Sequence, residues 1–510
     1  MVNRSRADTL PYWVDSASMP RFPKLDRDEQ VDVAIVGGGI TGLTAAYLLT
    51  AAGKSVAVIE RERCATVDTG HTSAHLTMVT DRTLTDLVNS FGRDHAQAVW
   101  DAGLCALGQI DTIVHDERIA CDYAWVRGYV HAPIGARPGD HRKTFEDEAR
   151  LASDLGFDAE LVDEVPFVGG PGVMFPDQAR VHPRKYLAGI ARVLADRGAM
   201  IFENTAVDEF CDEPLSLEAN GHKISCQYVV LATHTPLTGN TGLLRATLFQ
   251  TKLALYTTYV IAGRTAKNHL PDALFWDTAD PYHYLRIERH RDYDVVIFGG
   301  EDHKTGQASD PNACFDRLER TLRSMNGRID ITHRWSGQVI ETPDGLPYIG
   351  ETAERQFAGT GFSGNGLTFG TLTGMMAADR VIGRKNPWSE LFDPGRKKIL
   401  GGAAWDYIRE NKDYPYYMIR DRFAGAEGRS AREVPRGTGR ILTRNGQKVA
   451  LYRDDRGATI ARSAICTHMA CTVSWNDAER TWDCPCHGSR FKPDGSVIAG
   501  PAESPLGEVE

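Results

Sequence analysis

The sequence lacks several features that would place it in common classes of protein. It has no excess of basic residues, because 58 lysine and arginine residues stand against 68 aspartate and glutamate residues, a formal net charge of −10. It also lacks an apolar stretch of roughly 18 residues and the hydrophobic run of a secretory signal. We therefore expect no nucleic-acid partner and no membrane insertion, and we predict a cytoplasmic protein.

Length and cysteine use bound the organisation of the chain. At 510 residues it is longer than one hydrophobic core usually serves, so we expect two or three domains. Six of its ten cysteines are scattered and are expected to be free in a reducing compartment: Cys64, Cys105, Cys121, Cys211, Cys226 and Cys314. The other four lie between Cys466 and Cys486, and this clustering indicates a dedicated site.

A dinucleotide-binding unit stands near the beginning of the chain. The segment VDVAIVGGGITGLTAAYLL, from Val31, predicts a buried strand, a glycine turn and an amphipathic helix, and a second strand follows. Gly37, Gly39 and Gly42 form GxGxxG at the turn, where glycine lets backbone N–H groups approach a pyrophosphate at the helix N-terminus. Glu60 ends the second strand, where it can accept hydrogen bonds from an adenosine ribose. The sequence therefore predicts binding of NAD or FAD.

Two later motifs favour FAD. TPDGLPYIG begins at Thr342, and FAGTGFSGNGLTFGTLTGMMAADRVIG begins at Phe357. They resemble the second flavin-contacting motif of the superfamily of D-amino-acid oxidase, glycine oxidase and sarcosine oxidase, and the resemblance covers about 31–383. It implies FAD contacts from Asp344, Gly361, Gly364 and Gly366. In addition, the glycines precede a helix whose positive N-terminal end could face the anion formed when an isoalloxazine is reduced, which an NAD enzyme does not need.

The same resemblance assigns two further segments. In the family, the loop after the second strand lies against the flavin, and here that loop is DTGHTSAHLTM, which contains His71 and Thr72. Val207 matches a position whose backbone touches the adenine side. Some relatives tether FAD covalently through a histidine in this region, which makes His71 and His75 candidates. Because their spacing does not match cleanly, we favour a ring that is held without a covalent bond.

In the middle of the chain, predicted strands follow one another without helices between them, and this pattern predicts a sheet that faces the substrate. KLALYTTYVIAG, YHYLRIE and YDVVIFGG are strands at short spacing, which indicates an antiparallel sheet inserted into the α/β domain. Strand alternation puts Tyr282, Tyr284 and Arg286 on one face. Two phenols and a guanidinium could orient a substrate carboxylate, a use that the superfamily often makes of such residues. The alternative, of equal weight, is that they line a solvated sheet. No dedicated general base stands out, and Trp335 is expected in the core.

The clustered cysteines form a metal-binding pattern with two histidines. Cys466, His468, Cys484 and His487 are arranged as CxH and CxxH, with one thiolate and one imidazole in each loop. A structural zinc site uses the same residue types, but its ligands more often pair as CxxC with HxxxH. The alternate order favours a Rieske [2Fe–2S] cluster, in which two thiolates bind one iron and two histidines bind the other.

The C-terminal segment, about 439–506, resembles Rieske proteins in its cluster loops CTHMAC and CPCHGS and in the loop AGPAESPL. The resemblance implies a disulfide between Cys471 and Cys486, as in the respiratory type, although a reducing cytosol disfavours disulfides. Ser489 is kept, but Phe491 stands where the respiratory type has a hydrogen-bonding tyrosine, so we expect a lower reduction potential. The chain stops after AESPLGEVE, which predicts a module that is one strand short.

These segments combine into one predicted architecture. It is a Rossmann-type α/β FAD-binding domain with an inserted antiparallel substrate sheet, followed by a small all-β Rieske domain. The predicted boundaries are 1–29 for an N-terminal lead, 30–420 for the FAD-dependent oxidoreductase with its sheet at about 245–335, 421–438 for a linker, and 439–510 for the Rieske domain.

The predicted function is FAD-dependent oxidation of an amine or amino-acid-like substrate, with electrons relayed from reduced FAD through the [2Fe–2S] cluster to an external acceptor. This favours a dehydrogenase over an oxidase. Three alternatives stay open: electrons that enter from a donor protein, an oxidase with a structural or regulatory cluster, and a non-catalytic redox sensor. The substrate, the redox partner and the oligomeric state do not follow from the sequence.

Overall fold

The computed structural model describes residues 9–137, 141–235, 253–308, 310–325, 328–396, 433–444, 447–468 and 470–509. Within these residues the predicted fold class, mixed α/β with a C-terminal all-β domain, is confirmed. The predicted linker at 421–438 lies mostly outside them. In the described part of the predicted lead, a short helix α1 (Tyr12–Ser16) is followed by strand β1 (Glu29–Gln30).

A six-stranded sheet carries the glycine turn. Its strand order is β18-β19-β12-β2-β3-β8, and neighbours are parallel except for the antiparallel pair β18–β19. β2 and β3 are wholly buried apolar runs, as expected for a parallel sheet that is covered on both faces. The strands are β2 (Val33–Val36), β3 (Val56–Ile59), β8 (Met200–Phe202), β12 (Tyr228–Leu231), β18 (Tyr348–Ala353) and β19 (Gln356–Thr360).

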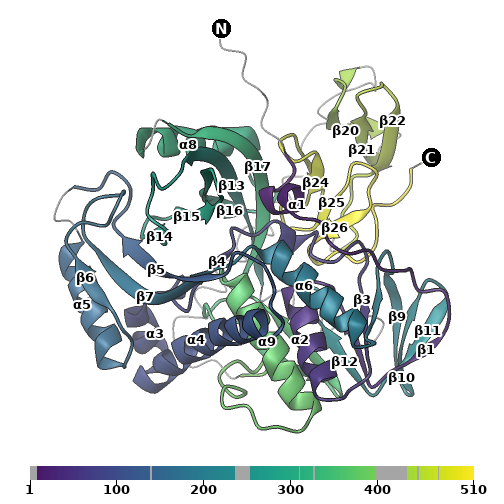
Figure 1. The fold of residues 1–510 in the computed structure, drawn as a ribbon. Coiled ribbons are helices and arrows are strands. Elements are labelled where there is room, and N and C mark those ends of the chain that lie inside the picture. The colour runs from purple at the N-terminus through teal and green to yellow at the C-terminus, as the bar shows by residue number, and fades with distance from the viewer. Residues whose placement is uncertain are drawn as a thin grey trace.

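Helices pack around this sheet, and a smaller sheet adjoins it. α2 follows the glycine turn and contacts α9 and α6, and α9 also contacts α4 (Figure 1). The helices are α2 (Ile40–Ala51), α3 (Leu84–Phe91), α4 (Arg93–Asp116), α5 (Arg142–Asp154), α6 (Pro183–Asp196) and α9 (Gly366–Val381), with a 3₁₀ turn η1 (Asp68–Gly70). The smaller sheet has the order β1-β11-β10-β9, with β9 (Val207–Asp212), β10 (Leu215–Ala219) and β11 (His222–Ser225). Among the described residues, no helix combines the length and the apolar character that crossing a membrane requires.

The large sheet is assembled from distant parts of the chain. Its order is β17-β13-β16-β15-β14-β5-β7-β4, with β6 beside β7. The strands are β4 (His75–Leu76), β5 (Ala124–His131), β6 (Glu160–Val162), β7 (Gly172–Arg180), β13 (Ala254–Ala266), β14 (Ala273–Asp277), β15 (Tyr284–Arg289), β16 (Tyr293–Lys304) and β17 (Asp330–Glu341), and helix α8 (Pro311–Met325) packs on β13 and β16. The predicted range 245–335 therefore covers only part of the sheet, because β4 to β7 join it from the preceding segment.

The C-terminal domain contains two small antiparallel sheets. One is β20 (Thr438–Arg444), β21 (Gln447–Arg453) and β22 (Thr459–Ser463), and the other is β23 (Ser474–Asn476), β24 (Thr481–Asp483), β25 (Arg490–Phe491) and β26 (Val497–Ala499). Near the end of the chain, the backbone of Glu508 forms an isolated antiparallel β-bridge with Arg462 of β22. This pairing brings the last described residues of the chain against β22. Figure 1 shows the yellow C-terminal strands lying against the rest of the protein.

Candidate functional site

The glycine turn between β2 and α2 is too closely packed for side chains. A Cβ on Gly37 would lie 2.3 Å from the carbonyl oxygen of Ala232, and a Cβ on Gly42 would lie 1.9 Å from that of Gly37. Glu60 accepts hydrogen bonds from the backbone N–H groups of Gly38 and Glu62, each at 2.8 Å. Burial raises the pKa of Glu60, and these N–H groups oppose that shift. The turn has the form that lets a backbone approach a pyrophosphate.

A cavity of about 700 Å³ extends from this turn to the large sheet. Its volume lies in the range of cofactor and ligand sites. The predicted residues that line it are Gly37, Gly39, Glu60, His71, Thr72, His75, Val207, Tyr282, Tyr284, Gly364 and Gly366. The C-terminal domain completes the wall with a segment that includes Ile498, Gly500 and Pro505. The two domains therefore share one cavity.

Three residues that were predicted to contact the cofactor are not among the described residues that line the cavity. Gly42 packs inside the glycine turn, and a Cβ on Gly361 would lie 2.3 Å from Cγ2 of Thr342. Asp344 forms an ion pair with Arg396, in which Oδ1 and Nη2 are 2.8 Å apart. These residues shape the turns beside the cavity and are absent from its described lining.

Arg286, which was predicted to bind a substrate carboxylate, lies in a buried ion pair with Glu288. The alternation is as predicted, because Leu285 and Ile287 pack in one core cluster and Tyr284 packs in another. The Arg286 guanidinium, however, is fully buried, pairs with Glu288 and donates to two backbone carbonyls. Glu288 neutralises its charge, and Arg286 is not among the described residues that line the cavity.

The two predicted phenols do reach the cavity. Tyr284 shares a hydrogen bond with Thr258, with the two hydroxyl oxygens 2.8 Å apart, and Tyr282 donates to Oδ2 of Asp81 at 3.3 Å. The two tyrosine ring centroids are 5.8 Å apart. Burial raises the pKa of both phenols, so each keeps its proton and can donate at neutral pH.

Two tryptophans hold the loop that was predicted to lie against the flavin. Nε1 of Trp335 donates to the carbonyl oxygen of His71 at 2.9 Å, and Nε1 of Trp13 donates to that of Thr72 at 2.8 Å. Both indoles are fully buried. Trp335 therefore lies in the core, as expected, and also supports this loop. No sequence motif pointed to the same role for Trp13.

Orphaned ring nitrogens in the cavity wall fit a polar ligand. Nδ1 of His75 and Nε2 of His234 are buried and have no hydrogen-bond partner among the residues that the structure describes, and both residues line the cavity. Burial lowers the pKa of His75 to about 3, so its imidazole is neutral. Buried polar atoms normally have partners, so these nitrogens together with the glycine turn fit the polar groups of a dinucleotide cofactor.

The two loops predicted to bind a cluster bring two thiols and two imidazoles together. Cys466 and Cys484 are buried, and their mutual hydrogen bond and burial raise the pKa of Cys484. The ring centroids of His468 and His487 are 5.0 Å apart. Burial lowers the pKa of each histidine to about 4, so both rings are neutral. A pair of thiols beside a pair of neutral imidazoles is the donor set of a Rieske cluster.

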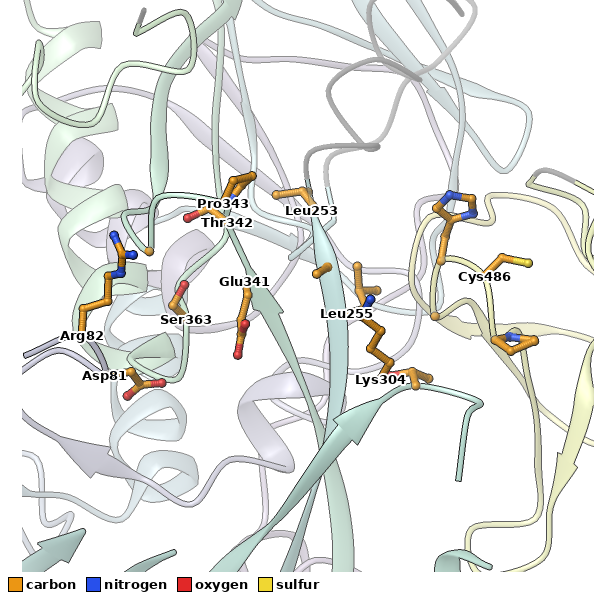
Figure 2. A pocket seen from close by; sticks show the side chains of 16 residues that line it. Asp81, Arg82, Leu253, Leu255, Lys304, Glu341, Thr342, Pro343, Ser363 and Cys486 are labelled. Atoms are coloured by element: carbon orange, nitrogen blue, oxygen red, sulfur yellow. The ribbon is translucent and has the colours of Figure 1, made fainter. Parts of the chain in front are cut away.

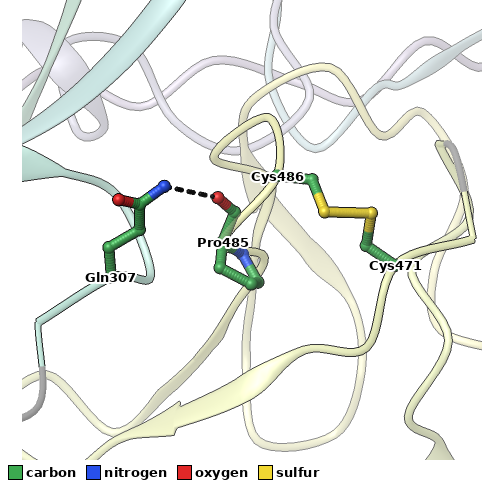
Figure 3. The surroundings of a disulfide bond; sticks show 4 residues. All are labelled: Gln307, Cys471, Pro485 and Cys486. Carbon is green, nitrogen blue, oxygen red and sulfur yellow. Dashed lines mark hydrogen bonds between the residues drawn. A yellow bond between two sulfur atoms is a disulfide. The ribbon is translucent and has the colours of Figure 1, made fainter. Parts of the chain in front are cut away.

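A disulfide between Cys471 and Cys486 joins these loops (Figure 3). Next to it, Nε2 of Gln307 donates to the carbonyl oxygen of Pro485 at 3.1 Å, so the segment after β16 contacts the second loop. Ser489 is buried, and its hydroxyl accepts the N–H of Ala502 at 3.1 Å. The loops are thus tied to each other and to the neighbouring domain.

Strand β17 contacts both sites. Gln338 lines the large cavity, and its Nε2 donates at 2.8 Å to the carbonyl oxygen of Gly488, the residue after His487. On the same strand, the hydroxyl of Ser336 accepts from Nη1 of Arg490 at 3.3 Å. No local motif marks Gln338, because its contact depends on how the domains dock.

A second cavity of about 370 Å³ lies between the second cluster loop and the large sheet (Figure 2). Figure 2 shows Asp81 and Ser363 on one side of it and Cys486 on the other, and His487 and Gly488 also line it. Asp81 and Ser363 also line the first cavity. The two cavities therefore adjoin, and His487, a predicted cluster ligand, lies at the wall of the smaller one.

Comparison with known proteins identifies the class to which this arrangement belongs. Residues 32–380 match the family model described as FAD dependent oxidoreductase, and residues 428–510 match that of the Rieske [2Fe-2S] domain. The chain belongs to the FAD dependent oxidoreductase family and carries a C-terminal Rieske domain. The predicted resemblances and the predicted cofactors, FAD and a [2Fe–2S] cluster, are thereby confirmed.

Particular relatives share the full chain or one of its parts. The putative Rieske 2Fe-2S iron-sulfur protein YhfW of Bacillus subtilis is 30% identical over 519 residues, covering 100% of both chains. The cytochrome b6-f complex iron-sulfur subunit of Chlorobaculum tepidum is 45% identical over 76 residues, which are 15% of this chain and 41% of that protein. The crystal structure of glycine oxidase from Geobacillus kaustophilus shares the fold, with a TM-score of 0.60 and 17% identity over 73% of this chain and 100% of its own.

Proposed function

We propose that this chain oxidises an amine or amino-acid-like substrate and passes the electrons singly, by way of its cluster domain, to an external acceptor. When bound, FAD supplies a hydride acceptor and the [2Fe–2S] cluster supplies a one-electron carrier. The chain's own residues orient the substrate and connect the two sites. As proposed, the protein is a dehydrogenase rather than an oxidase.

Gln338 is the observation that carries this proposal. Its side chain lines the cavity that the glycine turn opens, and it donates to the carbonyl oxygen of Gly488, which follows the cluster ligand His487. A direct hydrogen-bonded contact of this kind favours electron exchange within the chain. A purely structural cluster would not require such a contact.

The substrate side of the cavity offers hydroxyl and amide groups. Tyr282 and Tyr284 are proposed to orient the substrate as hydrogen-bond donors, together with Thr258 and Gln338, which line the same cavity. Arg286 is left out of this role because Glu288 occupies it. An amine that has lost its extra proton and is held in one orientation can give up a hydride from its adjacent carbon.

Anaerobic rapid mixing of the holoprotein with a panel of amines and amino acids tests the proposal. Flavin absorbance should bleach first, and the EPR signal of a reduced Rieske cluster should follow. Gln338→Leu should slow the second phase several-fold relative to the first. Gln307→Leu is the matched control, because it loses a hydrogen bond to the same cluster loop without lining the flavin cavity. Equal second phases in the two variants would contradict a route through β17.

Cys484→Ser, which removes a cluster ligand, separates the proposal from its alternatives. The variant should still bleach its flavin on mixing but should lose electron transfer to the external acceptor. If oxygen instead reoxidises the flavin equally fast in this variant and in the wild type, the protein is an oxidase whose cluster is structural or regulatory. A flavin that no member of the panel bleaches would favour a redox sensor.

A further inference from the structure

Asp81 lies where the two cavities adjoin. It lines both of them, and Figure 2 shows its side chain on the far side of the smaller cavity from Cys486. Its Oδ2 accepts a hydrogen bond from the hydroxyl of Tyr282 at 3.3 Å, and a Cβ on Gly364 would lie 2.5 Å from the same oxygen. The carboxylate thus stands between a phenol of the substrate side and the turn before α9.

The surroundings of Asp81 suit it to hold and release a proton. The side chain of Asp81 is exposed to the cavities, but the dense protein around it and the charge of Asp302 raise its pKa to about 7, while the hydrogen bond from Tyr282 opposes the shift. Asp302 itself has a pKa raised to about 7 by burial and is hydrogen-bonded to Thr258. The smaller cavity is also lined by Arg82, Lys304, Glu341 and His487. The larger cavity is lined by further titratable groups, which are Glu60, Arg61, Arg63, Asp68, His71, His75, Asp208, His234, Tyr282, Tyr284 and Glu503. A carboxyl that titrates near neutrality in a cavity wall can act as a proton acceptor during turnover.

We propose that Asp81 accepts the proton of the substrate's ammonium group and releases it into the second cavity. An N–H bond of the substrate breaks, an O–H bond forms on Asp81, and the freed nitrogen lone pair allows the adjacent carbon to lose a hydride. FAD, when bound, would supply the acceptor of the hydride, and the external one-electron acceptor would finally take its two electrons while its proton leaves to solvent. Asp81 then returns to its carboxylate form by losing its proton.

The direction of proton movement follows from the charge in the cavity. Reduction of a cofactor bound in the larger cavity, which Asp81 lines, would add negative charge to that cavity, and a nearby like charge favours the neutral form of a carboxyl. Asp81 therefore holds its proton in the reduced protein and gives it up on reoxidation. This inference rests on the proposed oxidation of an amine, and it supplies the base that the sequence did not reveal.

Redox-induced infrared difference spectroscopy of the holoprotein tests the inference. Electrochemical reduction at pH 8 should produce the C=O band of a protonated carboxyl, because Asp81 is mostly ionised at that pH before reduction. Asp81→Asn should abolish the band. Asp302→Asn should keep the band, because Asp302 lines neither cavity, but should weaken it, because loss of the Asp302 charge lowers the pKa of Asp81. A band that persists in Asp81→Asn, or that only Asp302→Asn removes, overturns the inference.

The rate of flavin reduction by substrate gives the second readout. In the wild type it should fall about tenfold per pH unit below pH 7, and in Asp81→Asn it should lose this dependence and be about a hundredfold slower at pH 8. Should Asp81→Asn retain no flavin, Tyr282→Phe takes its place, since loss of the opposing hydrogen bond should move the profile to higher pH. A pH profile of flavin reduction that does not move in Tyr282→Phe, or that moves to lower pH, contradicts the inference. The infrared measurement needs no substrate, and it does not depend on electron transfer from the flavin to the cluster. Its result can therefore be read even if the proposed relay of electrons fails.

Discussion

Phe491 shows how one side chain bears on the properties of the cluster domain. It is fully buried and packs in the C-terminal core with Trp482, two residues after the buried Ser489. By resemblance to respiratory Rieske proteins, a tyrosine at this position would donate a hydrogen bond on the sulfur side of the cluster. Phenylalanine has no hydroxyl, so one donor that would stabilise the reduced cluster is missing.

Phe491→Tyr is therefore expected to raise the reduction potential of the cluster. The potential should rise because the added donor stabilises the more negative, reduced state of the cluster. We expect a rise of roughly 60 mV, which corresponds to a tenfold change in the one-electron equilibrium constant. An EPR-monitored redox titration measures it. Phe491→Leu is the control, since it alters the packing without adding a donor. An unchanged potential in Phe491→Tyr would mean that the hydroxyl does not reach the cluster.

Individual residues differ in how far the sequence could place them. The spacing of Cys466 with His468 and of Cys484 with His487 is local, so the sequence alone was enough to propose them as a set. The ion pair of Arg286 with Glu288, two residues further along the same strand, was not predicted, because the strand pattern does not show which side of the strand is buried. Gln338 could not have been proposed, since its contact joins positions that are 150 residues apart.

Helix α1 is short, yet it supports the loop around Thr72, which lines the larger cavity. Trp13 is fully buried, donates to the carbonyl oxygen of Thr72, and lies with its ring centre 5.1 Å from the Arg286 guanidinium. The helix thereby ties the N-terminal segment to the buried ion pair and to the cavity wall. Removing its hydrogen bond should loosen the cavity without touching the glycine turn.

Trp13→Phe is expected to weaken FAD binding roughly fivefold, because one lost hydrogen bond costs about 1 kcal/mol. The FAD dissociation constant, measured by flavin fluorescence after removal and re-addition of the cofactor, checks this. Tyr12→Phe is the matched control on the same helix, because it loses a hydrogen bond to Nε2 of His290 and not to the loop. Equal weakening in both variants would point to a general loss of α1 docking instead.

Secondary structure was predictable where its signals are local. The βαβ unit of β2, α2 and β3 follows from two apolar runs and a glycine turn, and the structure contains it at the predicted place. The large sheet was predictable only in part. β14 pairs in parallel with β5, so that Ala273 lies opposite Arg127, and no pattern within either segment encodes this long-range register.

The docking of the two domains links the protein as a whole to pH. The ion pair between Lys492 and Glu62 joins the domains, but both side chains are substantially exposed, and such a pair contributes at most about 1 kcal/mol. Glu479 differs, because its side chain is mostly buried near Arg490 and hydrogen-bonds to Ser336 of β17. Burial raises the pKa of Glu479 to about 7.

Glu479→Gln is expected to flatten the pH dependence of the stability of this docked domain. In the folded state the raised pKa makes Glu479 bind its proton more tightly than in the unfolded chain. Its stabilising contribution is therefore complete below the unfolded pKa of about 4.5 and is lost as the pH rises through about 7. The loss is at most roughly 3 kcal/mol. Denaturant midpoints from pH 5 to pH 8, followed by the visible circular dichroism of the cluster, should fall with pH in the wild type and fall less in Glu479→Gln.

Glu62→Gln is the control for this prediction, because it also removes a carboxylate from the domain contact. Since Glu62 is more exposed than Glu479, its loss should lower the midpoint slightly at every pH and leave the slope of the wild type unchanged. If all three proteins share one slope, Glu479 is solvated in the folded protein. The contact between β17 and the cluster domain would then open in solution, and the route through Gln338 would be intermittent. A flatter slope in Glu479→Gln alone supports a closed, packed contact.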